Sequence, residues 1–503
     1  MAVLSDFIDY ASGGSKWPLL LGAAGILALY YRLILRFKRA SLPIYSTHTG
    51  WFSSWYDSLD YLRDSPGVLK AGYEKFSKFG LFYKLRTPVR WVIVVPPQFV
   101  DEIRTAPSTH LSARKSAKVL AISPIVEANK FHFHIIKTHL TPSLELKIRE
   151  LLDEIGLVSG EEIGRPADWK PVVMARAAHR IATRTANRLL VGAPLCRNEE
   201  YLQMSIKYTI DVFGGADKLR SWPDFLKSPV TYFVTNVNER QKIARKHLVL
   251  YIQYRLEEVE KQQDTLKDKP IDSLQWLIDA APSPKERDPN RLMYRLLHLN
   301  VAAVHTTSVT FLNCAYDLAL HTGIHVELRE EIETAVQEEG WTARGLSRMR
   351  KLDSFMLESQ RLAPIASSQM TRAVTSDFTF SDGTTVPKGS YVLVPMHAMY
   401  LDDSLFPDAS KFDAFRWCRL RDQPGNETRY QFVTTSPTHI NFGHGRDACP
   451  GRFFAAQGIK LLLAHTLIHY DLCLEDRTGL PKPSWYDRSR LPNQTARVLF
   501  RTR

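Results

Sequence analysis

The hydrophobic positions of the chain fall into a short apolar run near the N-terminus and a long body with helical or strand periodicity. Residues 17–35 are almost wholly apolar, and their number is close to the roughly 20 that a membrane-spanning helix needs. Arg36, Lys38 and Arg39 follow the run, so the basic residues place its C-terminal side in the cytosol. No small-residue cleavage site follows it, which argues against a signal peptide. We therefore expect a single-pass transmembrane anchor over 17–35, with residues 1–16 in the lumen.

The body of the chain shows mainly helical patterns and a few short strands. A linker broken by Pro43 covers residues 36–54. Two runs rich in β-branched and aromatic residues, 82–86 and 91–95, predict a pair of strands around the turn at Pro88. The segments with helical patterns are 55–80, several pieces of 168–260, and 293–320.

Composition and charge narrow the possible partners. The chain has 503 residues and a formal net charge of +13. A basic surface can attract nucleic acid, anionic lipid or an acidic protein, but we find no nucleic-acid motif and expect no nucleic-acid partner. The five cysteines are scattered and odd in number, which favours a reducing compartment over a disulfide framework. We expect the basic residues near the N-terminus to contact lipid headgroups. The alternative is that the basic residues form an ordinary solvated surface.

One cysteine stands in a motif that predicts metal chemistry. The residues 441–455 read Asn-Phe-Gly-His-Gly-Arg-Asp-Ala-Cys-Pro-Gly-Arg-Phe-Phe-Ala, and the pattern Phe453, Phe454, Ile459 and the leucines beyond predicts a buried helix behind the turn. A cysteine before a helix start lies at the positive end of the helix dipole, which favours the thiolate. A single thiolate without zinc-spaced partners suits the axial ligand of a haem iron, and a buried structural thiol is the plain alternative.

The spacing Phe442-Gly-x-Gly-x-x-x-Cys449-x-Gly resembles the haem loop of the cytochrome P450 superfamily. The run Cys-Pro-Gly-Arg-Phe-Phe-Ala is similar to the fungal secondary-metabolism branch of that family. The resemblance extends from about residue 55 to about residue 495. It implies a mainly α fold with small β-sheets, the cytochrome P450 fold, as one catalytic domain over 55–503 behind the membrane helix. It also implies haem b, with the Cys449 thiolate as the iron ligand and Phe442 beside the haem.

A second motif lies in the predicted helix 293–320. Ala302-Ala303-Val304-His305-Thr306-Thr307-Ser308 resembles the oxygen-activation motif of the family, Ala/Gly-Gly-x-Asp/Glu-Thr-Thr. A threonine hydroxyl can bond the carbonyl four residues back and loosen the helix there. The resemblance gives Thr306 the task of hydrogen-bonding the bound oxygen. His305 stands where the family has an acid, and we expect it to relay protons because its ordinary pKa is close to neutral. A core histidine bonded to backbone is the alternative.

A third motif predicts a buried charge network. Glu358 and Arg361 lie three apart on one helical face, and Arg416 follows in Phe412-Asp-Ala-Phe-Arg-Trp. These residues resemble the Glu-x-x-Arg helix of the family and the later arginine that completes its triad. The resemblance implies that Glu358, Arg361 and Arg416 are structural and fix the segment that leads into the haem loop.

The resemblance also assigns the haem edge and the substrate pocket. Lys137, four residues after Phe133, and Arg372 match positions that reach the haem propionates. Asp447 stands where the family commonly has a basic residue, so we expect the adjacent Arg446 or a rearranged contact to meet the propionate there. Residues expected to line the pocket are Ala302, Ile365, Ser367 and Ser368, with the segment 212–237 as a mobile roof; ordinary helix packing explains single residues of that roof equally well.

The implied activity is that of a haem-thiolate monooxygenase. It would insert one atom of O2 into a C–H bond of a hydrophobic secondary metabolite, and the small or apolar pocket side chains favour a terpenoid. Electrons would come from NADPH through an NADPH–cytochrome P450 reductase docked at the basic face by the haem loop. The expected location is the endoplasmic reticulum membrane, with the catalytic domain in the cytosol. Alternatives are desaturation, epoxidation, ring coupling, O2-independent rearrangement and a non-catalytic haem protein.

Overall fold

The computed structural model describes residues 42–116, 131–220, 222, 224–261 and 269–503. The predicted lumenal segment and anchor, and the first part of the predicted linker, lie outside these residues. Within the described ranges, no helix combines the length and the apolar character needed to cross a bilayer.

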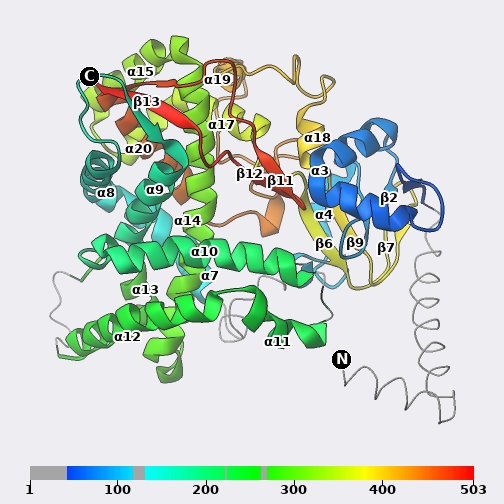
Figure 1. Ribbon diagram of the computed structural model, residues 1–503, viewed down its shortest axis with the longest axis horizontal. Helices are drawn as coiled ribbons and strands as arrows, with labels where there is room; N and C mark the ends of the chain where they lie inside the picture. Colours follow the sequence, from blue (N-terminus) through cyan, green and yellow to red (C-terminus); the bar gives the residue numbers. More distant parts are fainter. Residues whose placement is uncertain (1–41, 117–130, 221, 223, 262–268) are drawn as a thin grey trace, which may run out of the picture.

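Helix α14, Pro289–Leu320, runs through the middle of the molecule (Figure 1). Its start is encoded by Asp288 and Pro289, because the Asp288 carboxylate accepts a hydrogen bond from the Arg291 backbone N–H at 3.0 Å and proline is favoured in the first helical turn. The predicted helix 293–320 is therefore confirmed, with an earlier beginning. The helices that pack against it are α9 (Met174–Leu190), α10 (Glu199–Arg220), α12 (Val237–Lys261), α17 (Arg350–Leu362) and α20 (Arg452–His469).

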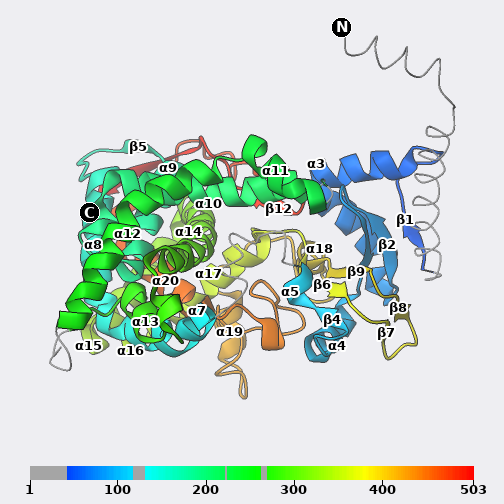
Figure 2. The same cartoon turned by 90° about the horizontal axis from the view of Figure 1, so that it is seen from below.

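The main sheet lies at one end of the molecule and most of the helices lie at the other (Figures 1 and 2). Its strand order is β1 (Ile44–Tyr45), β2 (Tyr83–Arg86), β3 (Trp91–Val94), β9 (Tyr391–Val394), β6 (Gln369–Val374) and β4 (Leu111–Ser112). Strands β2 and β3 pair antiparallel around the turn that the sequence predicts. The predicted helix 55–80 is α3 (Ser53–Lys75), followed by a short 3₁₀ turn.

The remaining elements complete a mainly helical fold with small sheets. Strand β13 (Arg497–Thr502) pairs antiparallel with both β10 (Tyr470–Leu474) and β5 (Lys170–Val173), so the end of the chain closes a three-stranded sheet. The other strands are β7 (Phe378–Thr379), β8 (Thr385–Val386), β11 (Ser484–Tyr486) and β12 (Ser489–Leu491). The other helices are α4 (Val100–Thr105), α5 (Ala113–Ser116), α7 (Phe131–Ile135), α8 (Thr141–Glu162), α11 (Asp224–Val234), α13 (Ser273–Asp279), α15 (His325–Glu339), α16 (Ala343–Arg348), α18 (Met396–Tyr400) and α19 (Arg416–Arg421).

The helix predicted behind the cysteine turn is α20, and it belongs to the core. Phe454, Ile459 and the leucines 461–463 are buried, as the pattern indicates. Phe453 is an exception, because its side chain is exposed and the Arg452 guanidinium lies 4.4 Å from its ring centroid. The prediction that Phe453 is buried is wrong. A residue at the first turn of a helix can face outward when the next turn already fills the core.

Candidate active site

The Cys449 loop is a tight turn whose shape depends on glycine. Gly443 and Gly445 have φ angles of +70° and +74°, a region that costs other residues strain. The Cys449 backbone N–H donates to the Phe442 carbonyl at 2.7 Å and closes the loop. A Cβ atom at position 445 would lie only 1.9 Å from Cγ of Arg104, on helix α4. The sequence therefore fixes both the curvature of the loop and its close approach to α4.

The Cys449 thiol lies just before α20 and is open to a cavity. Burial by surrounding protein raises the pKa of the thiol, while the backbone N–H groups of Gly451 and Arg452 and the positive charge of Arg452 act to lower it. Free backbone N–H groups at a helix start favour a thiolate in this way. A metal ion at the sulfur would favour the thiolate further, because a coordinating thiol loses its proton.

The cavity at Cys449 has a volume of about 380 Å³ and mainly apolar walls. The loop and α20 supply one side, and helices α7 and α14 and the start of β6 supply others. Its principal apolar lining residues are Phe133, Ile136, Leu299, Ala302, Ala303, Ile365, Met370, Phe442 and Phe454. A cavity of this size with few polar groups is typical of a site for a small organic ligand.

Helix α14 presents one face to this cavity, and His305 is not on it. Ala302, Ala303 and Thr306 line the cavity, and the Thr306 hydroxyl donates to the Ala302 carbonyl at 2.9 Å. The His305 ring instead lies against Phe213 of α10, with ring centroids 4.5 Å apart. At about 100° per residue, the lining residues 299, 302, 303, 306, 307 and 310 form one broad face of the helix, and position 305 falls outside that face.

The relay predicted for His305 therefore lacks direct access to the cavity. Burial, together with nearby His179, lowers the pKa of His305 to about 4, so its imidazole is neutral at physiological pH. The ring packs on Phe213, so the relay through His305 stays a prediction.

At the cavity edge, Arg372 pairs with a carboxylate of the chain itself. The Arg372 guanidinium lies 3.3 Å from the Asp447 carboxylate, and both residues line the cavity. Arg446, which we expected to take this place, donates to the Ala106 carbonyl at 3.4 Å and does not line the cavity. Lys137 is exposed and also outside the lining, although Phe133 is part of it. The structure thus brings Arg372 to the cavity and leaves Arg446 and Lys137 outside.

The predicted pocket residues separate into two groups. Ala302 and Ile365 line the cavity, but Ser367 and Ser368 do not. The Ser367 hydroxyl is buried against that of Ser65 at 2.8 Å, and Ser368 borders a different cavity beside β3 and β6. The segment turns after Ile365, so the pocket prediction is wrong for the two serines.

The three charged residues of the predicted triad meet around Glu358. Its carboxylate accepts from Arg361 Nη2 at 2.7 Å and from Arg416 Nε at 3.2 Å. Glu358 and Arg361 are completely buried, and Arg416 is largely so. The Trp417 indole N–H, at 3.0 Å, is a further donor that sequence reasoning missed. The network ties α17 to α19 at the beginning of the segment that leads to Cys449.

Comparison with known proteins decides the family. The sequence model of the family described as Cytochrome P450 matches residues 86–500. The chain belongs to the cytochrome P450 family. It is 33% identical over 500 residues to cytochrome P450 monooxygenase AN1598 of Emericella nidulans, covering 96% of this chain and 92% of that protein. It is 34% identical over 488 residues to monooxygenase olcJ of Penicillium canescens, covering 95% and 91%. Monooxygenase 151 of Postia placenta is 33% identical over 498 residues, covering 97% and 99%.

This cytochrome P450 is accordingly a haem-thiolate monooxygenase, and the cavity residues fit a haem group. The family implies haem iron held by a cysteine thiolate, and Cys449 is a cysteine at the cavity wall. Both polar atoms of the Asn441 side chain, Thr307 Oγ1 and Arg372 Nε are buried at this wall, and none has a hydrogen-bond partner among the described residues. Unpaired buried polar atoms call for a bound group or ordered water. The apolar walls suit the macrocycle, and Arg372 can receive a carboxylate.

Several lining residues of this P450 were missed from the sequence. Leu299 and Thr310 lie on the same face of α14 as Thr306, at helical spacings of seven and four residues. This periodicity could have identified both from the motif. Asn441 lies directly before Phe442 in the haem-loop motif, but the resemblance assigned it no role. Gln369 ends the segment 365–369 that the resemblance places at the pocket, and it does line the cavity. Met370 carried no signal, since the turn into β6 determines which of its residues face inward.

Proposed function

We propose that the protein inserts one oxygen atom of O2 into a C–H bond of a hydrophobic secondary metabolite, with a terpenoid favoured. The observation that carries this proposal is the juxtaposition in one cavity of the Cys449 thiol, an apolar lining, and the Ala302–Thr306 wall of α14. Fungal monooxygenase relatives over nearly the full chain support the reaction class. The few polar groups on the walls suit a ligand with little hydrogen-bonding capacity.

Each residue at the cavity has a defined task in this proposal. Cys449 holds the iron through its sulfur, with the Gly451 and Arg452 N–H groups moderating the charge on the thiolate. Arg372 holds a carboxylate of the haem edge. When bound, the haem supplies the chemistry of dioxygen activation, while the protein supplies binding, orientation and electrostatics. The apolar residues exclude water and orient the substrate against the α14 wall.

Thr306 holds a proton at the site of reaction. Its hydroxyl donates to the Ala302 carbonyl, and its oxygen keeps lone-pair capacity toward the cavity. The same hydroxyl can turn to donate into the cavity, at the cost of the Ala302 bond. A proton reaching Thr306 from His305 would need a water or a side-chain rotation between them, because the imidazole packs on Phe213.

Electrons are proposed to come from NADPH through an NADPH–cytochrome P450 reductase. The basic charge of the chain and the exposed Arg446 at the Cys449 loop support docking of an acidic protein there. The protein is proposed to act at the endoplasmic reticulum membrane, with residues 17–35 in the bilayer. The apolar run followed by basic residues supports this placement.

Two measurements test the proposal. The purified protein, reduced under carbon monoxide, should give the absorption band of thiolate-bound haem, and Cys449→Ser should abolish that band. Coexpression with a reductase in a microsomal host fed candidate terpenoids should then give products one oxygen heavier by mass spectrometry. Normal haem spectra in Cys449→Ser would overturn the assignment of the ligand. Product formation without NADPH or O2 would instead establish a rearrangement reaction.

A further inference from the structure

A second cavity, of about 1120 Å³, lies next to the charge triad and shares no lining residue with the Cys449 cavity. Most of its lining comes from three parts of the chain: the segment 405–413, helix α19, and the segment 429–439 that leads into the Cys449 loop. Leu357 of α17, Gln423, and His444 of the Cys449 loop complete it. Its volume is sufficient for a drug-sized ligand, whose pockets usually measure about 300–1,000 Å³. Of the residues given a role at the haem site above, only Arg416 and Trp417, which both contact Glu358, line this cavity.

One buried wall of this second cavity is aromatic and contains an unpaired histidine. The Trp417 ring lies 5.9 Å from the ring of Tyr430 and 6.0 Å from that of His439. His439 is 7% exposed, and neither of its ring nitrogens has a hydrogen-bond partner within the described part of the chain. Burial and the nearby charge of Arg361 lower the pKa of His439 to about 4, so the neutral ring offers one donor and one acceptor. An unpaired buried polar group is costly, and a ligand in the cavity would relieve that cost.

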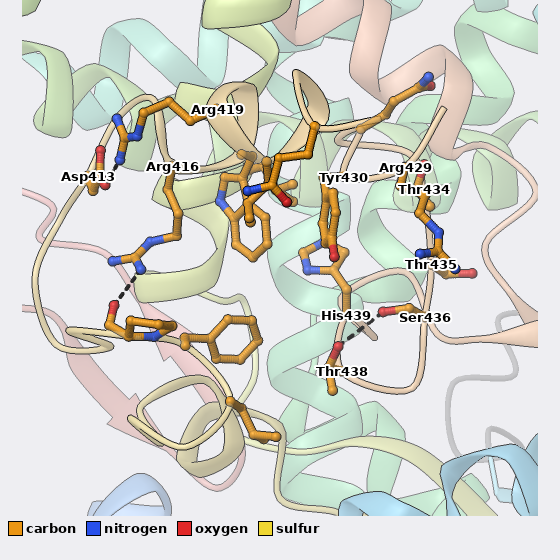
Figure 3. Close-up of a pocket in the computed structure, with 18 of the residues that line it drawn as sticks. Asp413, Arg416, Arg419, Arg429, Tyr430, Thr434, Thr435, Ser436, Thr438 and His439 are labelled. Carbon is orange, nitrogen blue, oxygen red and sulfur yellow. Dashed lines mark hydrogen bonds and ion pairs between the residues drawn. The ribbon is translucent and has the colours of Figure 1, made fainter. Parts of the chain in front are cut away.

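The rim of this cavity carries an excess of positive charge. Lys411 and Arg419 are each paired with an aspartate of the rim, but Arg429 contacts only the neutral Asn426 amide, at 3.4 Å, among the side chains that the structure places. Arg416 adds a partly uncompensated charge, since Glu358 is shared with Arg361. Figure 3 shows Arg416 and Arg419 on one side of the cavity and the hydroxyl residues Thr434 and Thr435 on the other, with Tyr430 and His439 between them.

We propose that this second cavity is a binding site for a planar aromatic anion, a ring system that carries a carboxylate or phosphate group. The ring would lie against the Tyr430–Trp417–His439 wall, where stacking is favourable. The anionic group would face Arg429 and the threonine hydroxyls, whose donors suit carboxylate and phosphate oxygens. His439 would form the hydrogen bond that it lacks with a polar atom attached to the ring of the ligand.

Direct binding to the full-length haem-loaded protein tests this site. The probe is 1-naphthyl phosphate, which combines a flat ring with an anion, and its fluorescence is measured in equilibrium dialysis. Two competitors separate the parts: 1-naphthol has the ring alone, and inorganic phosphate has the anion alone. The haem absorption spectrum is recorded at each step, because a ligand in the Cys449 cavity would perturb it and a ligand in the second cavity would not.

We expect one saturable site per protein and no change in the haem spectrum. 1-Naphthol and inorganic phosphate should each compete more weakly for this site than 1-naphthyl phosphate itself. Arg429→Ala should weaken binding about two- to fivefold, as expected for an exposed ion pair. His439→Phe should weaken it about fivefold through the loss of one hydrogen bond, yet fold normally, since its nitrogens have no partners among the residues that the structure describes. The matched control Arg344→Ala removes an exposed arginine outside the cavity and should leave binding unchanged.

Three results would overturn the proposal. The first is no saturable binding of the probe. The second is binding that is equally strong in Arg429→Ala and His439→Phe, or that appears only as a change in the haem spectrum. The third is binding of an acidic peptide without binding of 1-naphthyl phosphate, which would make this cavity a protein-docking surface. The proposal does not depend on the identity of the oxidised substrate.

Discussion

Removal of the Glu358 carboxylate is the sharpest test of how the site is held in place. Glu358 is completely buried and accepts hydrogen bonds from Arg361, Arg416 and the Trp417 indole. In Glu358→Ala, the buried Arg361 guanidinium keeps its bonds to the Tyr400 and Ala409 carbonyls, at 2.6 Å each, but loses its counter-charge.

The size of the effect follows from that uncompensated charge. Loss of one partner of a buried ion pair costs about 3–5 kcal/mol, a large part of the roughly 5–15 kcal/mol that stabilises a typical domain. Because Arg416 lies in the segment leading to Cys449, we expect Glu358→Ala to yield protein without haem. Glu358→Gln keeps an acceptor oxygen and should lose less, about 1.5–3 kcal/mol, the value of hydrogen bonds to charged groups.

The assay combines urea unfolding, followed by circular dichroism, with haem content per protein. Glu330→Gln, which removes one negative charge from the exposed surface of α15, is the matched control and should change neither. Trp417→Phe removes the neutral donor and part of a buried ring, so it should cost about 1 kcal/mol for the hydrogen bond and a further amount for the lost packing. If Glu358→Ala retained full haem and unfolded within about 0.5 kcal/mol of the wild type, the range typical of surface changes, the structural role of the triad would be refuted.

Three further predictions concern the Cys449 cavity and the core beside it. Asp447→Asn should free Arg372 for a haem carboxylate and slow haem transfer to an acceptor protein roughly two- to fivefold, a modest effect because Asp447 is partly exposed; faster loss would show that Asp447 instead positions Arg372. Thr306→Ala should keep haem and substrate binding but lower the ratio of product to NADPH consumed, and an unchanged ratio would remove Thr306 from proton delivery. Burial raises the pKa of Asp317 to about 7 from an ordinary value near 4, so the native state holds its proton more tightly and stability falls as the pH rises between these values. Asp317→Asn should therefore stabilise the protein more at pH 8 than at pH 4 in thermal unfolding, and an equal shift at both would contradict the assignment.

The sequence predicted the elements whose signals are local. The glycines around Cys449 and the spacing of Glu358 and Arg361 each act over a few residues. The helix-start signal at Asp288-Pro289 is equally local, but the predicted helix began only at Met293. Predictions failed where tertiary contacts choose between neighbouring side chains. Arg446 and Asp447 are adjacent, and only the packing of the loop on β6 decides which of them faces Arg372.

The same limit applies within regular elements. Ser367 lies only two residues after Ile365, yet its hydroxyl turns to Ser65 on α3, far away in the sequence. The period of helix α14 places His305 outside the face that carries Thr306. A motif match alone does not show which face of the helix lines the cavity. The second cavity had no sequence signal at all, because its lining combines three segments whose residues are individually ordinary.

The close approach of Gly445 to Arg104 has a consequence for the order of assembly. Helix α4 is made more than 300 residues before the Cys449 loop during translation. We expect the loop to reach its final curvature only when helix α4 has already folded. Cofactor capture is thus expected to be a late maturation step, and chains arrested before the loop emerges should carry no pigment.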